Sequence, residues 1–293
     1  MPFGFSRGYG GGGRRGPMGC NPRLLIALVI AVIGIVGYLS KRSVNPTTGE
    51  KQYVALSPDQ EIRLGIEAAP QMAQQMGGVI PQSDPAAAMV TEVGNHIVQS
   101  SEAKKSPYVK SFEFYLLNDS KTINAFALPG GKIFITRALY DKLTNEAQLA
   151  GVLGHEIGHV INRHAAEHMA KGQLGGALAT AVGVGASDDR GRGMGAAVAA
   201  QMANQVIQLR FGRKDETESD SYGLKYMIQG GYDPRAMLDV MNVLKEASKG
   251  GRSPEWLSSH PAPADRLEEV DRQIKQLLPN GIPSELTTGR PLR

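Results

Sequence analysis

The stretch His155-Glu156-Ile157-Gly158-His159 decides the fold of this 293-residue chain. Residues four apart lie on one face of an α-helix, so His155 and His159 can hold one Zn²⁺ ion from a rigid backbone. Glu156 follows the first ligand and is placed to take a proton from a water molecule that the zinc acidifies. The H-E-x-x-H pattern therefore predicts a helix that carries both the metal and the general base of a peptide-hydrolysing site.

The sequence around this motif predicts a helix that is seated in a core. Asn145 is a candidate N-cap, with Gln148 three residues later as in a capping box. Apolar residues then recur at helical spacing: Leu149, Val152, Leu153, Ile157, Val160 and Ile161. Three glycines weaken this helix by up to about 1 kcal/mol each relative to alanine. We interpret them as positions of close packing or of metal access: Gly151, Gly154 and Gly158.

An acidic segment downstream, Asp215–Asp220, offers a third metal ligand. Catalytic zinc sites usually keep three protein ligands and one open position. Glu216 and Asp220 are four residues apart on an expected helix, so we predict that Glu216 binds the metal while Asp220 accepts a hydrogen bond from a ligating histidine. Glu218 is the competing ligand, although no carboxylate lies four residues after it.

Four segments, in this order, resemble the HtpX/BepA-type gluzincin metallopeptidases, a group that includes the CAAX prenyl proteases and the mitochondrial Oma protease. They are N-A-F-A-L-P-G-G from Asn124, H-E-I-G-H, E-T-E-S-D from Glu216, and Ser259-His260-Pro261. The resemblance covers about Ser57 to Leu278. It implies one zinc ion per chain, held by His155, His159 and Glu216, with Asp220 as the supporting carboxylate. Ser219 stands where the family more often has alanine.

The resemblance also changes the interpretation of His260, which as a lone loop histidine would be read as solvated. The corresponding histidine of the family approaches the metal. We therefore expect His260 either to stabilise the oxyanion of the transition state or to occupy the open zinc position at rest, as a latch. The expected catalytic residues are then Glu156, His260 and Asp220.

The remaining histidines receive structural interpretations. His164 and His168 follow His155 and His159 by nine residues, which is half a turn out of phase on a continuous helix. We expect them to point away from the zinc face, as surface or second-layer residues. His96 lies in an amphipathic stretch and is interpreted as structural.

A small sheet is expected before the zinc helix. Residues 112–117 and 132–136 have strand-like composition, and residues 124–128 between them read as extended. A metallopeptidase needs an exposed strand edge beside its metal, where a substrate adds through main-chain hydrogen bonds. The alternative is an ordinary hairpin closed by a Pro-Gly-Gly turn. The resemblance places three substrate-binding residues on the edge: Asn124, Ala125 and Phe126.

The N-terminal part predicts a membrane anchor. Residues 1–23 are rich in Gly and Arg and are expected to be disordered. Residues 24–40 supply an apolar run that flanking side chains extend just enough for a single-pass signal anchor. A cleaved signal peptide is the alternative, although residues 36–40 offer a poor cleavage site. Arginines before the run place the tail in the cytoplasm and the catalytic domain on the periplasmic side of a bacterial inner membrane.

Charge and cysteine content exclude other classes. The chain has 32 Lys and Arg against 28 Asp and Glu, but residues 1–45 hold six of the basic residues and none of the acidic ones. The remainder, with 26 basic and 28 acidic residues, is close to neutral and lacks the electrostatic footprint of a nucleic-acid-binding protein. Cys20 is the only cysteine and precedes the apolar run, which disfavours a lipoprotein anchor. A catalytic part without cysteine suits a periplasm-like compartment.

These signals predict an α+β protein, whose mostly helical gluzincin domain over residues 57–279 has a small sheet with its edge strand beside the zinc site. A turn-rich linker, 41–56, precedes the domain and a tail, 280–293, follows it. The Gly/Ala-rich segment 172–195 is either a plug near the cleft or part of a helical hairpin packed on the domain. Its apolar half, 174–186, is too short to cross a bilayer, and the resemblance favours a lid.

Two functions follow from these expectations. The first is a membrane-anchored zinc endopeptidase, and the resemblance implies misfolded or unassembled envelope proteins as its substrates. The second is a chaperone-like envelope assembly factor whose zinc site is kept closed by His260. The intact Glu156 favours the first, because a purely structural zinc site needs no general base. Oligomeric state is left open by the sequence.

Overall fold

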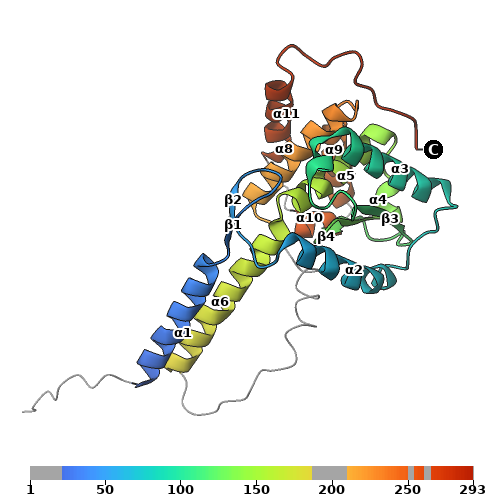
Figure 1. The fold of residues 1–293 in the computed structure, drawn as a ribbon. Coiled ribbons are helices and arrows are strands. Elements are labelled where there is room, and N and C mark those ends of the chain that lie inside the picture. The colour runs from blue at the N-terminus through green and yellow to red at the C-terminus, as the bar shows by residue number, and fades with distance from the viewer. Residues whose placement is uncertain (1–21, 187–209, 250–253, 261–264, 293) are drawn as a thin grey trace, which may run out of the picture.

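The computed structural model describes residues 22–186, 210–249, 254–260 and 265–292. Helices enclose a small sheet in one domain, and a pair of long helices projects from that domain (Figure 1). The arrangement confirms the predicted α+β class with helices in the majority. Both the sheet and the surrounding helices are organised around the helix that carries the H-E-x-x-H motif.

That helix, α5 (Glu146–Ile161), is buried along its whole length. Asn145 is its N-cap and accepts a hydrogen bond from the backbone N–H of Gln148 at 3.0 Å, as predicted. Helix α8 (Arg213–Gln229) crosses α5 at close range. A Cβ atom on Gly158 would lie only 2.9 Å from the carbonyl oxygen of Ser219, so glycine at this position permits the approach. Gly158 thus serves close packing, as does Gly154, on which a Cβ atom would lie 3.3 Å from Gly223; Gly151 has room for a Cβ atom. Helices α3 (Pro85–Ser100) and α9 (Ala236–Ser248) pack around the same core.

The sheet has the strand order β3-β5-β4. β3 (Glu113–Leu117) runs parallel to the buried central strand β5 (Lys132–Thr136), and β4 (Ala125–Leu128) runs antiparallel to it. β4 forms a hairpin with β5 and is at the same time the edge of the sheet. The two interpretations of this segment are therefore compatible.

Further helices cover the sheet and the site. α2 (Pro58–Gln75) begins with Ser57 as its N-cap and Pro58 in its first turn, and Gln60 completes a capping box. η1 (Glu102–Lys105) and α4 (Arg137–Tyr140) are short connections. α10 (Glu255–Ser259) and α11 (Arg266–Leu277) come from the C-terminal part and close the metal side of the domain.

The segment expected as a linker contains an ordered hairpin, β1 (Arg42–Val44) and β2 (Lys51–Tyr53). Asn45 donates from its amide to the carbonyl of Ile161 at 2.8 Å, and Gln52 donates to the carbonyl of Asn162 at 2.5 Å. The last carbonyl groups of a helix have no partner within it, so the hairpin caps the C-terminal end of α5. The hairpin that follows α1 is therefore fixed to the helix that carries the H-E-x-x-H motif.

The segment expected as a C-terminal tail caps the other end of α5. The backbone N–H groups of Glu146 and Ala147 donate to the carbonyls of Arg290 and Thr288, both at 3.0 Å. The guanidinium of Arg290 also pairs with Glu92 on α3 at 2.6 Å. Both ends of the zinc helix are thus held by residues that lie outside the expected domain bounds of 57–279.

Helix α1 (Pro22–Leu39) has a mean hydropathy of 2.3 and no buried residue. Among the residues that the structure describes, it is the one helix long and apolar enough to span a membrane. Helix α6 (His164–Ala186) runs beside it, and the two form the projecting pair in Figure 1. The expected lid is therefore not found over the cleft in its described part, since residues 174–186 lie along α1 instead; residues 187–195 fall outside the described ranges.

Candidate metal centre

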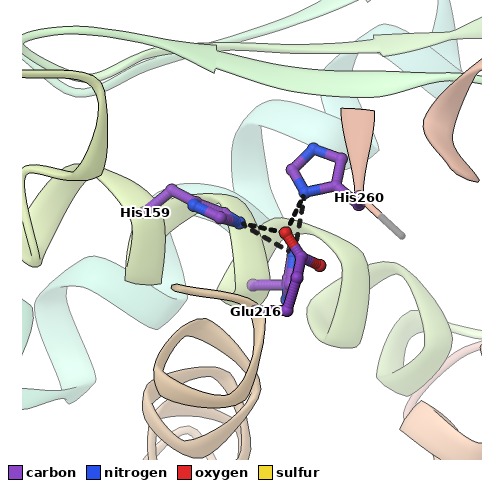
Figure 2. A group of neighbouring side chains, drawn as sticks. His159, Glu216 and His260 are labelled. Atoms are coloured by element: carbon purple, nitrogen blue, oxygen red, sulfur yellow. Dashed lines mark hydrogen bonds and ion pairs between the residues drawn. The ribbon is translucent and has the colours of Figure 1, made fainter. Parts of the chain in front are cut away.

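Four buried side chains from three segments point at one another. The Nε2 atoms of His155 and His159 are 3.1 Å apart, and Glu216 approaches both, at 3.6 Å and 3.5 Å. The Nδ1 atom of His260 lies 3.3 Å from His155 Nε2 and 3.0 Å from Glu216 Oε1. Figure 2 shows His159, Glu216 and His260 converging in this way. The structure thus brings together all three predicted ligands and His260.

These separations fit a shared zinc ion. Two donors bound to zinc at 2.0–2.1 Å in tetrahedral geometry lie about 3.3 Å apart. The chemistry of the donors agrees, because His155 gives its Nδ1–H to Asp220 and so turns a bare lone pair on Nε2 toward His159. Burial lowers the pKa of His159 well below its usual value, which keeps the imidazole neutral. Neutral imidazoles and a carboxylate aimed at one point need a cation between them.

Asp220 and Arg266 fix the orientation of His155. Asp220 Oδ1 accepts from His155 Nδ1 at 2.9 Å, in the predicted supporting role. Arg266, on α11, binds both oxygens of Asp220 at 2.9 Å and also reaches Glu216 Oε2 at 2.8 Å. Burial opposes ionisation of Asp220, but the charge of Arg266 and the hydrogen bonds from His155 and Arg266 together outweigh it and lower the pKa of the carboxyl group. One guanidinium therefore contacts two carboxylates of α8, those of Glu216 and Asp220.

The Nδ1 atom of His159 contacts another histidine, His164, whereas the Nδ1 atom of His155 contacts a carboxylate. His164 Nδ1 contacts His159 Nδ1 at 2.9 Å, and His164 Nε2 contacts Glu218 Oε2 at 3.1 Å. The expectation that His164 points away from the zinc face is wrong, because the helix is not continuous. Arg163 adopts a left-handed φ of 60° between α5 and α6 and turns the chain back toward the site. Glu218, the competing ligand, supports this second layer.

His168 is also near the site rather than at the surface. It follows His164 by one turn of α6, and its Nε2 lies 2.8 Å from Asp215 Oδ2. Burial opposes ionisation of Asp215, but the hydrogen bond from His168 and the nearby His164 outweigh it and lower the pKa of Asp215 to about 2. His96 does match its structural interpretation, since its Nε2 contacts the carbonyl of Gly230 at 2.9 Å.

Glu156 lies on the same helix, one residue after His155, and is 1% exposed. Its Oε1 atom accepts a hydrogen bond from the indole N–H of Trp256 at 3.1 Å. His260 Nε2 lies 3.6 Å from the same oxygen. The carboxylate is thus oriented by a neutral donor and faces the ring of the histidine that joins the metal ligands.

His260 is enclosed by aromatic rings. Trp256 stacks on it with centroids 5.0 Å apart, and Phe211 stacks on its other side at 5.3 Å. Burial would lower the pKa of His260, but the carboxylates of Glu156 and Glu216 outweigh it and raise that pKa. The position of the Nδ1 atom, in contact with two metal ligands, corresponds to the resting-latch interpretation of this residue.

An open cleft of about 380 Å³ leads from His260 to the sheet edge. Asn124 and Phe126 line it, together with Phe211. Ala125 is fully buried, main chain included, and does not line the cleft. Asn124 pairs with Thr136 through hydrogen bonds, and in this register the main-chain groups of Ala127 face away from β5. Of the three predicted residues, Asn124 and Phe126 therefore line the cleft beside the metal ligands, whereas Ala125 lies beneath its surface.

Sequence reasoning missed three residues of this site: His164, Phe211 and Arg266. Arg266 is 46 residues from Asp220, and nothing local marks it as a partner of that carboxylate. Phe211 lies just before α8 and carries no motif. The only local signal was the position of His164, three residues after Ile161, the last residue of the zinc helix. From the sequence, this stretch is interpreted as a continuation of that helix.

The comparison with known proteins agrees with this geometry. A model of Peptidase family M48 matches residues 85–274. The chain is 32% identical over 257 residues to the "Beta-barrel assembly-enhancing protease" of Yersinia pestis, covering 83% of this chain and 50% of that protein. It is 30% identical over 271 residues to the protein of the same name from Escherichia coli (strain K12), covering 89% and 54%.

A mitochondrial relative is similar over a comparable length of the chain. The human "Metalloendopeptidase OMA1, mitochondrial" is 28% identical over 253 residues, covering 83% of this chain and 48% of that protein. The chain spans about half the length of these curated relatives. The similarity therefore concerns the part that holds the metal ligands, the sheet edge and the helices around them.

Proposed function

This chain belongs to peptidase family M48, and from that premise we propose that it is a membrane-anchored zinc endopeptidase. The family confirms the prediction of a metallopeptidase related to the BepA and Oma proteins. The observation that carries the proposal is the convergence of His155, His159 and Glu216, with Glu156 beside them and an open strand edge next to them. A structural metal site needs neither the base nor the edge.

The proposed reaction is hydrolysis of a peptide bond. When bound, Zn²⁺ supplies a Lewis acid that polarises the carbonyl group and acidifies water. Glu156 takes one proton as the water oxygen bonds to the carbonyl carbon, and it gives that proton to the amide nitrogen as the C–N bond breaks. Trp256 fixes the Glu156 carboxylate for both transfers. Asp220 and Arg266 keep the ligands in place and act as positioning residues.

The proposed substrates are extended segments of proteins that are misfolded or not yet assembled. The main-chain groups of Ala127, which lines the cleft and turns these groups away from β5, can pair with an incoming strand by hydrogen bonds that are largely independent of side chains. Such an edge accepts unfolded chains and excludes folded ones. The name of the bacterial relatives, beta-barrel assembly-enhancing protease, supports proteins of the bacterial envelope as this class.

We further propose that α1 anchors the enzyme in the bacterial inner membrane, with the catalytic domain on the periplasmic side. The support is the apolar helix, which is uncharged from Leu24 to Leu39, the arginines before this run and the bacterial relatives. His260 then acts as a latch at rest, because its Nδ1 atom takes a place among the metal ligands. A substrate must displace this ring to reach the metal.

The resting position of His260 is also compatible with the second function, that of a chaperone-like assembly factor. A chaperone-like assembly factor would hold unfolded clients at the edge strand while His260 stays in the site. The contacts of His260 with Glu216 and His155 are the observation that favours it. The two functions differ in whether the site ever cuts a bound chain.

The test is cleavage of unfolded casein by the full chain in detergent, alongside Glu156→Gln and His260→Ala. For an endopeptidase we expect Glu156→Gln to lose at least about 10²-fold in rate while keeping one zinc per chain. His260→Ala should cut faster than the wild type if the latch interpretation holds. If both the wild type and His260→Ala bind zinc and cut nothing, the endopeptidase is excluded and the assembly factor stands.

A further inference from the structure

Helices α1 and α6 pack against each other over much of their length (Figure 1). The ammonium group of Lys41, just after α1, donates to the side chain of Gln173 on α6. Further along the two helices from this contact, a Cβ atom on Gly34 of α1 would lie only 2.8 Å from the Cβ atom of Ala177 of α6. The close approach and the hydrogen bond together fix which level of α6 lies beside which level of α1.

Both helices change from charged to uncharged at one common level. α6 carries Glu167 and Lys171 in its first part and no charged residue from 172 to 186. α1 is uncharged from Leu24 to Leu39, and Lys41 follows it. Since Lys41 reaches Gln173, the two boundaries lie in one plane. A polar-to-apolar boundary shared by two helices is what a membrane surface imposes.

The distal part of α6 is also a poor helix for water. Glycine is among the weakest helix formers, and a Cβ atom on Gly175 or Gly176 would meet nothing within 4 Å. No packing therefore compensates for these residues. In the hydrocarbon of a bilayer the helical conformation is strongly favoured, because each backbone N–H and C=O group must find a hydrogen-bond partner within the segment. Thr180, the one polar side chain of residues 174–186, donates to the carbonyl of Gly176 at 2.8 Å and needs no water.

Apolar side chains of α6 continue the exposed surface of α1. Val182 is 71% exposed and Leu178 is 37% exposed, whereas Val29 on α1 is 50% exposed. Nothing in the described part of the chain covers them. The exposed residues of α1 follow one another around the helix, so one flat protein surface would leave many of them in water, whereas lipid reaches every side.

We propose that the distal half of α6, residues 172–186, lies in the lipid bilayer beside α1. The inference rests on the proposed anchoring of α1. The enzyme is then held by a helical pair rather than by a single helix, and the polar first part of α6 lies at the membrane surface. The occupant of the exposed apolar face is the acyl-chain region of the membrane, not a second protein.

Site-directed spin labelling of the full chain tests this directly. In a Cys20→Ser background, single labels replace Val182 on α6, Val29 on α1 and Val44 on the hairpin, which is 61% exposed and serves as the water control. The protein is reconstituted in vesicles of phosphatidylethanolamine and phosphatidylglycerol. Collision with oxygen, which concentrates in lipid, is compared with collision with a water-soluble nickel chelate. Bound zinc per chain checks that each variant is folded.

We expect the label at Val182 to behave as the label at Val29, with frequent oxygen collisions and few nickel collisions, and the label at Val44 to show the reverse. Nickel access at Val182 with protection at Val29 would overturn the proposal while leaving the anchor intact. Nickel access at both would remove the anchor itself. Low collision rates with both reagents at Val182 would mean that another protein surface covers α6, which also overturns the proposal.

Discussion

At the scale of single residues, Arg266 balances the charge of the metal centre. Glu156, Glu216 and Asp220 are buried carboxylates, and Arg266 is the guanidinium that binds two of them. The three carboxylates and the one guanidinium have a summed formal charge of −2, which one divalent cation neutralises. The site is therefore matched to a single zinc ion in charge as well as in geometry.

The replacement Arg266→Lys should lower zinc affinity by about 10- to 100-fold, a range typical of residues that orient metal ligands. Lysine keeps the charge but loses the paired hydrogen bonds to Asp220, so His155 is no longer held. Competition with a zinc chelator measures the affinity. Arg272→Lys, on the exposed face of the same helix, is the matched control, and an equal affinity in both variants would refute the role of Arg266.

Glu61 gives a prediction for pH. It is 2% exposed, pairs with Arg163 at 3.0 Å and accepts from Tyr108. Burial raises the pKa of Glu61 to about 7, despite the opposing charge of Arg163. A carboxyl group with a raised pKa in the folded state stabilises the protein at low pH, and this contribution is lost as pH rises from about 4.5 to about 7.

The melting temperature of the wild type in detergent should therefore fall relative to Glu61→Gln as pH rises through this window. The difference between the two proteins corresponds to at most about 3 kcal/mol, from 1.36 kcal/mol per pKa unit. Thermal denaturation at pH 5, 6, 7 and 8 measures it. Glu67→Gln, on the exposed face of the same helix, should track the wild type; parallel curves for Glu61→Gln and wild type would contradict the raised pKa.

At the scale of elements, the crossing of α5 and α8 sets the metal geometry. His159 and Glu216 belong to different helices, and Gly158 lets these helices approach. Gly158→Ala should force them apart and weaken zinc binding, because the new Cβ atom would meet the backbone of Ser219 at 2.9 Å. Gly151→Ala, whose Cβ atom would make only ordinary van der Waals contacts, the nearest with methionine sulfur at 3.6 Å, should bind zinc normally. Equal zinc affinity in the two variants would exclude this explanation.

The sequence predicted what is local to one element. The ligand spacing on α5 and the Asn145 cap are set by residues within one or two turns of each other. The hairpin that caps α5 could not be predicted, because Asn45 and Ile161 are 116 residues apart. The orientation of His164 was misjudged because a single left-handed residue, Arg163, interrupts the helix between α5 and α6 and changes the direction in which His164 points. Backbone breaks of this kind follow from tertiary packing rather than from local propensity.

At the scale of the whole molecule, the helical pair sets the height of the active site. His164 contacts the metal ligand His159, and Gln173 lies at the proposed membrane surface. Nine residues of helix span about 14 Å at 1.5 Å per residue. The site would therefore work on segments close to the bilayer.

An unfolded segment tethered to the membrane by a short spacer should thus be cut faster than the same segment free in solution. The measurement compares vesicles that carry enzyme and tethered substrate with vesicles that carry enzyme and receive the soluble peptide at equal concentration. A second tethered substrate with a much longer spacer controls for local concentration. Equal rates for the short-tethered and free segments would contradict a site held near the surface.

The left-handed turn at Arg163 has a mechanical consequence. Helix α5 ends and helix α6 begins within three residues, and the first residue of α6 contacts the candidate ligand His159. If the distal half of α6 lies in the bilayer as proposed, a tilt of α6 is transmitted to His159 without an intervening hinge loop. Bilayer thickness would then alter the geometry of the metal site, and we expect zinc affinity to differ between vesicles of short-chain and long-chain lipids.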